Sequence, residues 1–340
     1  MNLTSKQREA LDIVNEGHNL FLGGPAGTGK SFLLCEIVKA LRLSGKCVHL
    51  TCTTGIACTN FPPELGAMTV HRWSGIQDGR YKAQEVISLI KSHAKFQDAL
   101  HRIKNTDTLI IDEVSMLSER LFNLLAEVCT IKDSSKQFGG MQLIMCGDFV
   151  QLPPVPNMLY NDDGKYCFES PLFEQLLCHK IYLNEIVRQN DQQLIRSIWE
   201  VSFGEVSDDT LMYIKTLQRP LSPDQQSIKL FATTHLVDNY NRKCVVEARG
   251  VVGEYLAEDT GENRHLSRLM APKILWLKVG SPVILLRNIS KILFNGLRGT
   301  VLAVEPDGPV VNFPTANQTL KIPKMTFTGI LCYNDDKIVI

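Results

Sequence analysis

The stretch FLGGPAGTGKSFLL, residues 21–34, sets the architecture of this 340-residue chain. Its Gly24, Gly29, Lys30 and Ser31 satisfy the G-x-x-x-x-G-K-[ST] pattern of a phosphate-binding loop. An apolar run precedes the loop and apolar residues at helical spacing follow it, so the loop is predicted to join a strand to a helix. In that context, backbone N–H groups at the helix N-terminus hold phosphate oxygens. The less favoured alternative is a glycine-rich turn without a ligand.

The loop predicts ATP and Mg²⁺ as the cofactors of the chain. Lys30 is expected to reach the β- and γ-phosphates, and the Ser31 hydroxyl to bind the magnesium ion. The full set of residues expected to bind the nucleotide in and beside the loop is Gly24, Pro25, Ala26, Gly27, Thr28, Gly29, Lys30, Ser31 and Phe32.

Short apolar runs recur along the first half of the chain, with helical patterns between them. The runs are HNLFLG (18–23), CVHLTC (47–52), TLIID (108–112) and MQLIMCGD (141–148). This alternation predicts a parallel sheet covered by helices on both faces. The first helix is expected to pack on the sheet through Leu33, Leu34, Ile37, Val38 and Leu41.

Two carboxylates stand at the end of the third run. Asp112 and Glu113 are delivered to the carboxyl end of a strand, where ligands bind in open α/β sheets. Asp112 is expected to hold the magnesium ion, and Glu113 to orient or deprotonate the attacking water. A solvated turn is the alternative for an isolated Asp-Glu pair.

The fourth run leads into GDFVQLPPV, residues 147–155. Asp148 and Gln151 are therefore expected at the same sheet edge as Asp112. Gln151 is interpreted either as a sensor of the γ-phosphate or as a loop amide without a role. Gln7 also has two interpretations, because Thr4-x-x-Gln7 fits a capping box while the amide suits recognition of adenine.

Composition places the chain among ordinary globular proteins. Lys plus Arg and Asp plus Glu both total 36, so a polyanion must be met by a local basic surface. The 10 cysteines form no zinc-finger spacing, and they are interpreted as reduced thiols of a cytosolic or nuclear protein. The N-terminal sequence does not fit a secretory signal, and no run is apolar for the roughly 20 residues of a membrane span.

A helical segment between residues 78 and 106 interrupts the alternation of strands. It is interpreted either as a solvated helical insert or as an insert facing nucleic acid. It carries the basic residues Lys82, Lys91, Lys95, Arg102 and Lys104.

Taken in order, several segments resemble the Pif (petite integration frequency) family of superfamily-one DNA helicases. The segments are GGPAGTGKSFLL, TCTTGIACTNF, AMTVHRWSGI, LIIDEVSML, FGGMQLIMCGDFVQLPPV, LNEIVRQND, LFATTHLVDNYN and LKVGSPVILLRN with LFNGLRGTV. The resemblance implies an ATP-driven motor that moves 5′ to 3′ on single-stranded DNA and unwinds duplexes, DNA–RNA hybrids and G-quadruplexes. It is expected in DNA repair, recombination, telomere or mobile-element maintenance, in the nucleus or mitochondrion of a eukaryote or otherwise in the cytoplasm.

The resemblance also assigns roles. Gln7 would contact adenine, Lys30, Glu113 and Gln151 would act in catalysis, and Arg188 would be an arginine finger. The alternative for Arg188 is a surface ion pair.

For DNA, the resemblance points to Thr54, His71 and Trp73 in the first lobe and to Thr234 and Asn241 in the second. Hydroxyls and amides suit backbone phosphates, and an exposed aromatic ring can stack on a base. Trp73 has a second interpretation as a core residue, so Thr54 and His71 are preferred.

The resemblance implies a RecA-like P-loop ATPase lobe over residues 1–180 and the first part of a second RecA-like lobe over 181–280. Residues 281–340 are expected to form a small SH3-like antiparallel barrel insert. The chain ends at YNDDKIVI without the TIHKSQG-type segment of the family, so we expect a truncated motor with nucleotide binding, weak hydrolysis and poor unwinding. The alternatives are an ATP- and single-stranded-DNA-binding protein without unwinding activity, or a RecD-like helicase subunit; oligomeric state is expected to be monomeric.

Overall fold

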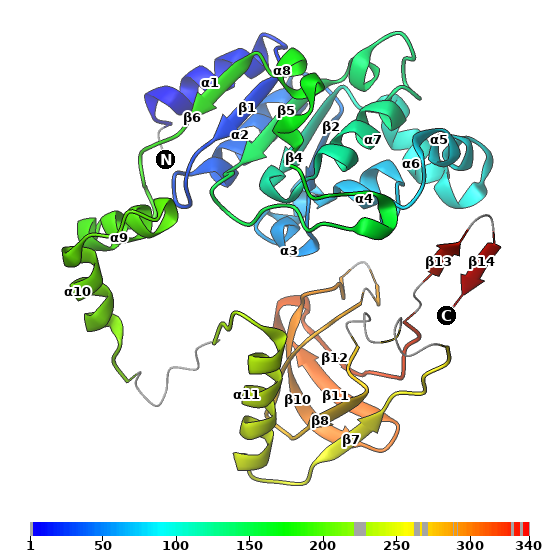
Figure 1. Cartoon of the computed structure of the whole chain (residues 1–340). Coiled ribbons are helices and arrows are strands. Elements are labelled where there is room, and N and C mark those ends of the chain that lie inside the picture. Colours follow the sequence, from blue (N-terminus) through cyan, green and yellow to red (C-terminus); the bar gives the residue numbers. More distant parts are fainter. Residues whose placement is uncertain are drawn as a thin grey trace. The chain divides into compact units, whose positions relative to one another are not determined.

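The computed structural model describes residues 3–220, 229–261, 266, 271–287, 289–290, 292–327, 330–333 and 336–339, the last two ranges as backbone only. The chain divides into two compact units, Met1–Pro220 and Leu221–Ile340. Figure 1 labels the elements of both units.

A six-stranded parallel sheet forms the centre of the first unit, with strand order β3-β2-β4-β5-β1-β6. The strands are β1 (Leu20–Gly23), β2 (Val48–Cys52), β3 (Met68–Thr69), β4 (Thr108–Asp112), β5 (Gln142–Gly147) and β6 (His179–Tyr182). The four strands that the apolar runs predict are β1, β2, β4 and β5. This confirms the α/β fold class.

Helices cover both faces of this sheet (Figure 1). They are α1 (Ser5–Asn15), α2 (Lys30–Leu43), α3 (Gly55–Cys58), α4 (Val70–Ser74), α5 (Ala83–Ser92), α6 (Gln97–Asn105), α7 (Glu119–Cys129) and α8 (Pro171–Leu176). Two further helices, α9 (Gln192–Phe203) and α10 (Asp208–Leu217), follow β6 and pack on each other rather than on the sheet. The predicted stripe of α2 is buried at every position, Leu33, Leu34, Ile37, Val38 and Leu41.

Alternation along β4 explains why the sheet has two separate cores. Ile110 belongs to the core beneath α1 and α2, whereas Leu109 and Ile111 belong to the core beneath α4–α7. Successive strand side chains point to opposite faces, so a continuous apolar run fills both cores. The helical insert predicted at 78–106 is formed by α5 and α6, which pack on the second core through Val86 and Ile103.

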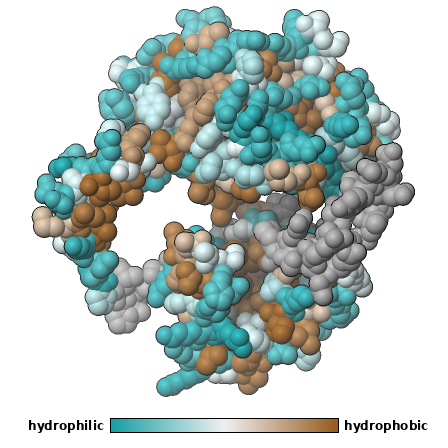
Figure 2. Space-filling model, in the orientation of Figure 1, coloured by the Kyte–Doolittle hydropathy of each residue, from teal (hydrophilic) through white to brown (hydrophobic). Residues whose placement is uncertain are grey.

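The boundary predicted at residue 180 falls inside β6, which pairs in parallel with β1. The first unit therefore continues through α9 and α10 to Pro220. Apolar side chains are exposed on these two helices, including Trp199 and Phe203, whose rings lie 4.6 Å apart. Figure 2 shows brown, hydrophobic surface over the region of α9 and α10.

The second unit is built from antiparallel strands and one long helix, α11 (Thr234–Glu247). Its sheets are a pair, β7 (Gly253–Leu256) with β8 (Ile274–Leu277), and a four-stranded sheet in the order β12-β11-β10-β9. The latter strands are β9 (Pro282–Ile284), β10 (Arg298–Glu305), β11 (Gly308–Phe313) and β12 (Gln318–Lys321); β13 (Ile330–Tyr333) pairs with β14 (Asp336–Val339).

A small apolar core holds the second unit together, centred on Val301, Val311 and Phe313. The antiparallel strands begin at Gly253, earlier than the predicted insert at 281–340, because Leu277 of β8 and Tyr255 of β7 pack on this same core. Lys278 joins α11 to β8, since its buried Nζ donates to the carbonyl of Ala248 at 2.6 Å. A cation at a helix C-terminus is stabilised by the unpaired carbonyls there.

Candidate functional site: a nucleotide cradle at the carboxyl edge of the sheet

Three glycines let the phosphate loop turn sharply between β1 and α2. Gly24, Gly27 and Gly29 have φ of 147°, 86° and 82°, a region that side chains with a Cβ rarely adopt. Gly29 is the N-cap of α2 and provides no side chain to cap it. The first N–H groups of α2 are therefore without intrahelical partners, as a phosphate site requires.

A second segment of chain, residues 183–188, runs beside the loop. The N–H of Leu183 donates to Gly23 O at 2.8 Å, and the N–H groups of Val187 and Arg188 donate to Gly27 O at 2.8 and 3.2 Å. A Cβ on Gly24 would lie 2.4 Å from the carbonyl oxygen of Leu183. The glycine at 24 is thus required by this close backbone approach.

Lys30 is held over the loop by the loop's own carbonyls. Its Nζ donates to Gly24 O at 2.6 Å and to Pro25 O at 3.1 Å. Thr28 supports the same turn, because its hydroxyl also donates to Pro25 O at 2.9 Å. The ammonium group therefore lies against the backbone of the loop, and its contact with phosphate stays a prediction.

Asp112 ends β4 and is 2% exposed. Burial raises the pKa of this carboxyl to about 6, and the charge of Glu113 adds to the increase. The Cys146 thiol, through a hydrogen bond, and the Lys30 ammonium partly offset these effects on the pKa. A buried carboxylate with so little compensation favours a nearby cation.

Glu113 has a strained backbone. Its φ of 58° and ψ of 43° lie in the left-handed region, which is unusual for a residue with a Cβ. The hydroxyl of Thr53 donates to its carbonyl at 2.9 Å, and the N–H of Thr53 donates to Asp112 O at 3.2 Å. Such strain is concentrated at functional sites, and here it turns the chain directly after the buried Asp112.

Gln151 is tied to Asp148 at the neighbouring strand end. The amide Nε2 donates to the Asp148 carboxylate at 3.2 Å, and the Gln151 N–H donates to Asp148 O at 3.0 Å. Asp148 is 6% exposed, whereas Gln151 is exposed. β1 and β5 are neighbours in register at Gly23 and Gly147, so this turn lies at the same sheet edge as the loop.

Gln7 forms the predicted capping box, and its side-chain amide also contacts the phosphate loop. The capping box is present, because the Thr4 N–H donates to Gln7 Oε1 at 3.0 Å and the Gln7 N–H donates to Thr4 Oγ1 at 3.3 Å. The other end of the amide, Nε2, donates to Thr28 O in the loop at 3.5 Å. The cap thus fixes a buried amide against the phosphate loop, and the role in reading adenine stays a prediction.

Arg188 lies beside the loop, at the end of the 183–188 segment. Its Cβ would be 3.0 Å from a Cβ on Gly27, and the residue is exposed. Within the part of the chain that the structure describes, its side chain forms no ion pair, so the surface ion-pair interpretation has no support there.

Thr54 and His71 belong to two short helices. Thr54 precedes α3 and His71 lies within α4. Thr54 is the N-cap of α3, where its hydroxyl accepts from the Ala57 N–H at 3.3 Å. His71 is half-buried in α4, and burial lowers its pKa below the ordinary value despite the charge of Asp78. A neutral imidazole and a capping hydroxyl are both compatible with contacts to phosphate oxygens.

The structure does not support the expected contact of Trp73 with DNA. Its side chain is 0% exposed and lies in the core beneath α4–α7, so its ring has no free face for a base. Its indole Nε1 is buried without a hydrogen-bond partner among the described residues. The interpretation of Trp73 as a core residue is the one that the structure supports.

Thr234 and Asn241 belong to the second unit, where both are exposed on α11. They are two helical turns apart and therefore lie on one side of the helix. Their role in DNA binding stays a prediction.

Sequence reasoning missed several residues that shape the site. Thr53 fixes the strained turn, Cys146 hydrogen-bonds Asp112, and Leu183 packs on the loop backbone. Thr53 directly precedes the expected site residue Thr54, and Cys146 lies in the same segment two residues before Asp148, so their positions in the sequence are a usable signal. Leu183 contacts the loop through backbone atoms, so its side-chain identity carried no signal.

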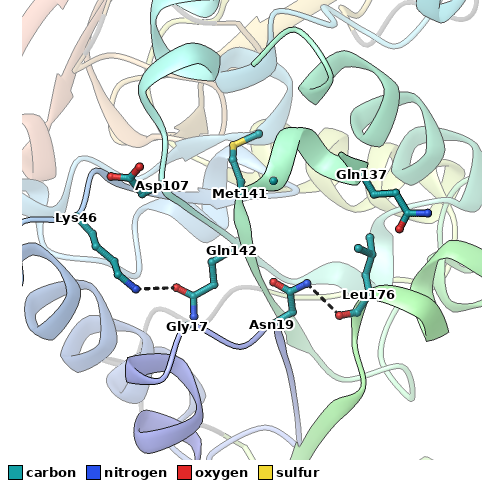
Figure 3. A pocket seen from close by; sticks show the side chains of 9 residues that line it. Gly17, Asn19, Lys46, Asp107, Gln137, Met141, Gln142 and Leu176 are labelled. Atoms are coloured by element: carbon teal, nitrogen blue, oxygen red, sulfur yellow. Dashed lines mark hydrogen bonds between the residues drawn. The ribbon is translucent and has the colours of Figure 1, made fainter. Parts of the chain in front are cut away.

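A separate hollow of about 340 Å³ lies at the opposite, amino edge of the sheet (Figure 3). Gln142 there donates to Val14 O and His18 O at 2.8 Å each and accepts from Lys46 at 3.4 Å. Asn19 donates to Leu176 O and accepts from the Leu143 N–H. These amides tie strand starts to neighbouring loops, so the hollow is a structural junction.

Comparison with known proteins agrees with the geometry at the carboxyl edge. A family model described as PIF1-like helicase matches residues 2–201. The chain belongs to the PIF1-like helicase family. A second model, described as the 2B domain of DNA helicase Pif1, matches residues 263–304. Between the Pif-type and RecD-like interpretations, these matches select the former.

Individual relatives give the same assignment. The ATP-dependent DNA helicase PIF1 of Candida albicans is 36% identical over 318 residues, which are 88% of this chain and 34% of that protein. Human PIF1 is 32% identical over 327 residues, which are 92% of this chain and 48% of that protein. The chain thus spans less than half the length of these PIF1 relatives.

Solved structures share the fold. The crystal structure of Pif1 helicase from Candida albicans matches with a TM-score of 0.75 at 36% identity, covering 89% of this chain and 69% of that one. Bacteroides Pif1 bound to single-stranded DNA matches with a TM-score of 0.76 at 24% identity, covering 100% and 79%. In the described residues of this PIF1-like chain, no helix has the length and apolar character needed to cross a membrane.

Proposed function

We propose that this chain is the ATP-hydrolysing part of a 5′-to-3′ DNA helicase that moves on single-stranded DNA and unwinds duplex, hybrid or G-quadruplex DNA. The proposal is supported by the arrangement of the site residues at one edge of the sheet. The phosphate loop, the buried Asp112 with the strained Glu113, and the Asp148–Gln151 turn all lie at one sheet edge, and the Arg188 segment is hydrogen-bonded to the loop.

The donor set at this edge fits magnesium–ATP. Lys30 is held by carbonyls within the cradle, Ser31 forms the first turn of α2, and the buried Asp112 carboxylate has no full counter-charge. In the proposal Lys30 binds the β- and γ-phosphates, and Ser31 and Asp112 hold the metal. A bound magnesium ion would supply charge neutralisation of the phosphates.

In the proposal Glu113 is the base or the group that orients the attacking water. Thr53 holds its carbonyl, so the backbone turn that directs its side chain is fixed before a nucleotide arrives. Pre-organisation of this kind reduces the reorganisation needed in the transition state. Gln7 contacts the adenine end of the nucleotide in this proposal, since its amide is anchored by the capping box.

Gln151 and Arg188 connect the γ-phosphate to movement. Gln151 is on an exposed turn, and Arg188 is an exposed guanidinium beside the loop, so both can change partners during a cycle. An arginine at the γ-phosphate stabilises transition-state charge and contributes a rate factor of about 10³–10⁵ in enzymes of this class.

Single-stranded DNA is the proposed track. Thr54 and His71 in the first unit and Thr234 and Asn241 in the second contact it in this proposal, through backbone phosphates that carry no sequence information. Bacteroides Pif1 has been solved with single-stranded DNA and with ADP-AlF₃. Roles in repair, recombination, telomere or mobile-element maintenance, and a nuclear or mitochondrial location in a eukaryote, complete the proposal.

The test is steady-state ATP hydrolysis with and without a single-stranded oligonucleotide. We expect slow hydrolysis that rises when DNA is added and that Glu113→Gln removes, while nucleotide binding stays. Glu119→Gln is the matched control, because Glu119 lies in the first turn of α7 beyond the strained turn. Nucleotide binding without any DNA-stimulated hydrolysis would instead favour an ATP- and DNA-binding protein without motor activity.

A further inference from the structure

A tryptophan and an arginine meet on the surface of the second unit. Trp276 lies on β8, and Arg242 lies on α11, which packs beside this strand (Figure 1). The guanidinium carbon of Arg242 is 4.9 Å from the centroid of the indole ring. A guanidinium over the face of a tryptophan is a cation–π contact. The two side chains therefore form one surface that is both aromatic and cationic.

The indole ring of Trp276 is held in place from the neighbouring strand. Glu254 of β7 pairs in register with Trp276, and the indole Nε1 donates to the Glu254 carboxylate at 2.8 Å. Side chains that are paired directly across an antiparallel ladder share one face of the sheet. The ring is thus positioned before a ligand arrives, which reduces the entropy that binding has to offset.

This contact lies on the outer face of the β7–β8 pair. Leu277, the next residue along β8, packs in the core of the second unit, so Trp276 points to the opposite face. Ile274 and Leu256 share the face of Trp276 and are 44% and 55% exposed. Trp276 is partly exposed and Arg242 is exposed. The aromatic and cationic surface is therefore accessible from solvent within this unit.

Arg242 forms no ion pair in the part of the chain that the structure describes. The next residue, Lys243, differs in this respect, because its Nζ is 3.8 Å from the Glu247 carboxylate. Arg242 also directly follows Asn241, which the proposed function places against DNA. A phosphodiester would supply the missing negative charge, and a nucleobase would supply a flat ring for stacking. An unpaired nucleotide fits both properties of this surface.

We propose that Trp276 and Arg242 form a base-stacking platform for single-stranded DNA. One unpaired base stacks on the exposed part of the indole, and the guanidinium attracts the adjoining phosphate. This inference rests on the proposed function and deepens it, because the second unit then binds a base as well as backbone phosphates. Every base has an aromatic face, so such a platform favours unpaired DNA without reading its sequence.

Tryptophan fluorescence tests the stacking directly. The chain has three tryptophans, and Trp199→Phe leaves only Trp276 and Trp73, of which Trp73 is fully buried. In the full chain carrying Trp199→Phe, we expect an oligothymidylate to quench the emission of Trp276. An abasic oligonucleotide of equal length, which keeps the phosphates but has no bases, should quench it much less. The two oligonucleotides carry the same charge, so the difference reports on the bases.

Affinity measurements separate stacking from charge. Trp276→Leu should weaken binding of the oligothymidylate about five-fold or more and leave binding of the abasic oligonucleotide nearly unchanged. Trp276→Phe keeps a ring and should restore part of the lost affinity. Lys243→Ala is the matched control, because it removes a charge beside Arg242 and should weaken binding of both oligonucleotides to a similar extent. Thermal unfolding of each variant checks that the second unit stays folded.

Two results would overturn the platform. One is an equal loss of affinity for both oligonucleotides in Trp276→Leu, and the other is quenching by the oligothymidylate that does not exceed quenching by the abasic oligonucleotide. The fluorescence result decides the question even where Trp276→Leu does not fold, because Trp199→Phe keeps Trp276 in place. A parent chain that binds neither oligonucleotide at low salt would instead contradict the proposed function, and the platform with it.

Discussion

At the scale of single residues, Asp112 has opposite effects on stability and on the proposed function. It is almost fully buried, and burial raises its pKa to about 6 from the ordinary 3.8, although the Cys146 thiol, the Glu113 backbone N–H and the Lys30 ammonium partly offset this increase. A carboxyl whose folded-state pKa is raised destabilises the fold when it ionises. Below about pH 4 the carboxyl is protonated in both states and does not lower the free energy of unfolding. As the pH rises from about 4 to about 6, this free energy decreases.

Replacing Asp112 by Asn should stabilise the chain in the absence of nucleotide. The isosteric amide removes the buried charge, so at pH 7 we expect a gain on the order of 2 kcal/mol, or a melting temperature higher by about 5 °C. The difference between the variant and the parent should shrink at pH 5, where the folded-state carboxyl is largely protonated. Thermal unfolding at the two pH values measures both effects.

Asp12→Asn is a suitable control, because Asp12 is an exposed residue of α1. It should change the melting temperature little at either pH. A lower melting temperature for Asp112→Asn at pH 7 would contradict the uncompensated buried charge.

Some residues of this site can be predicted from the sequence, whereas others need the structure. The phosphate-loop glycines and the Asp112–Glu113 pair were found because their spacing is fixed by backbone geometry. The choice between two roles for Trp73 needed its burial, and Gln7 needed the position of its amide beyond the capping box.

At the scale of elements, the turn after α7 explains a sequence signature. Phe138 and Gly139 both have positive φ, and the Phe138 side chain is fully buried against Phe122 with ring centroids 5.4 Å apart. A Cβ on Gly139 would lie 2.2 Å from Cys129 O, at the C-terminal end of α7. The FGG turn therefore closes tightly on the helix end and positions the start of β5.

Gly139→Ala should destabilise the first unit more than Gly140→Ala does. Both alanines would be strained by positive φ, but at 139 the new methyl meets a fixed backbone oxygen, whereas at 140 it meets the flexible Lys136 side chain at 2.8 Å. We expect a loss of about 3 kcal/mol or more for Gly139→Ala and about 1 kcal/mol for Gly140→Ala. Urea unfolding followed by tryptophan fluorescence measures the difference, and equal losses would contradict the proposed clash.

Element boundaries show where sequence patterns stop being informative. Buried parallel strands appear as continuous apolar runs, so β1, β2, β4 and β5 were predictable. β3 has two residues, and β6 reads HKIY with a polar alternation typical of an edge, so neither produced a strong run. The boundary expected at 180 therefore falls within β6, which joins the sheet through its pairing with β1.

At the scale of the whole molecule, two units of different design are joined in one chain. The first is a parallel α/β unit that carries the predicted nucleotide site, and the second is built mainly from antiparallel strands with its own small core. The fold class was predictable from the alternating pattern. The unit boundary at Pro220 was not, since α9 and α10 expose apolar side chains and resemble the start of a further core.

The most direct test of the central claim is a titration of the purified chain with a fluorescent ATP analogue, with and without magnesium. The account predicts magnesium-dependent binding that Lys30→Ala abolishes and that Lys39→Ala, an exposed lysine on the same helix, leaves unchanged. Binding that persists in Lys30→Ala, or no magnesium-dependent binding by the parent chain, would contradict a nucleotide site at the carboxyl edge of this sheet.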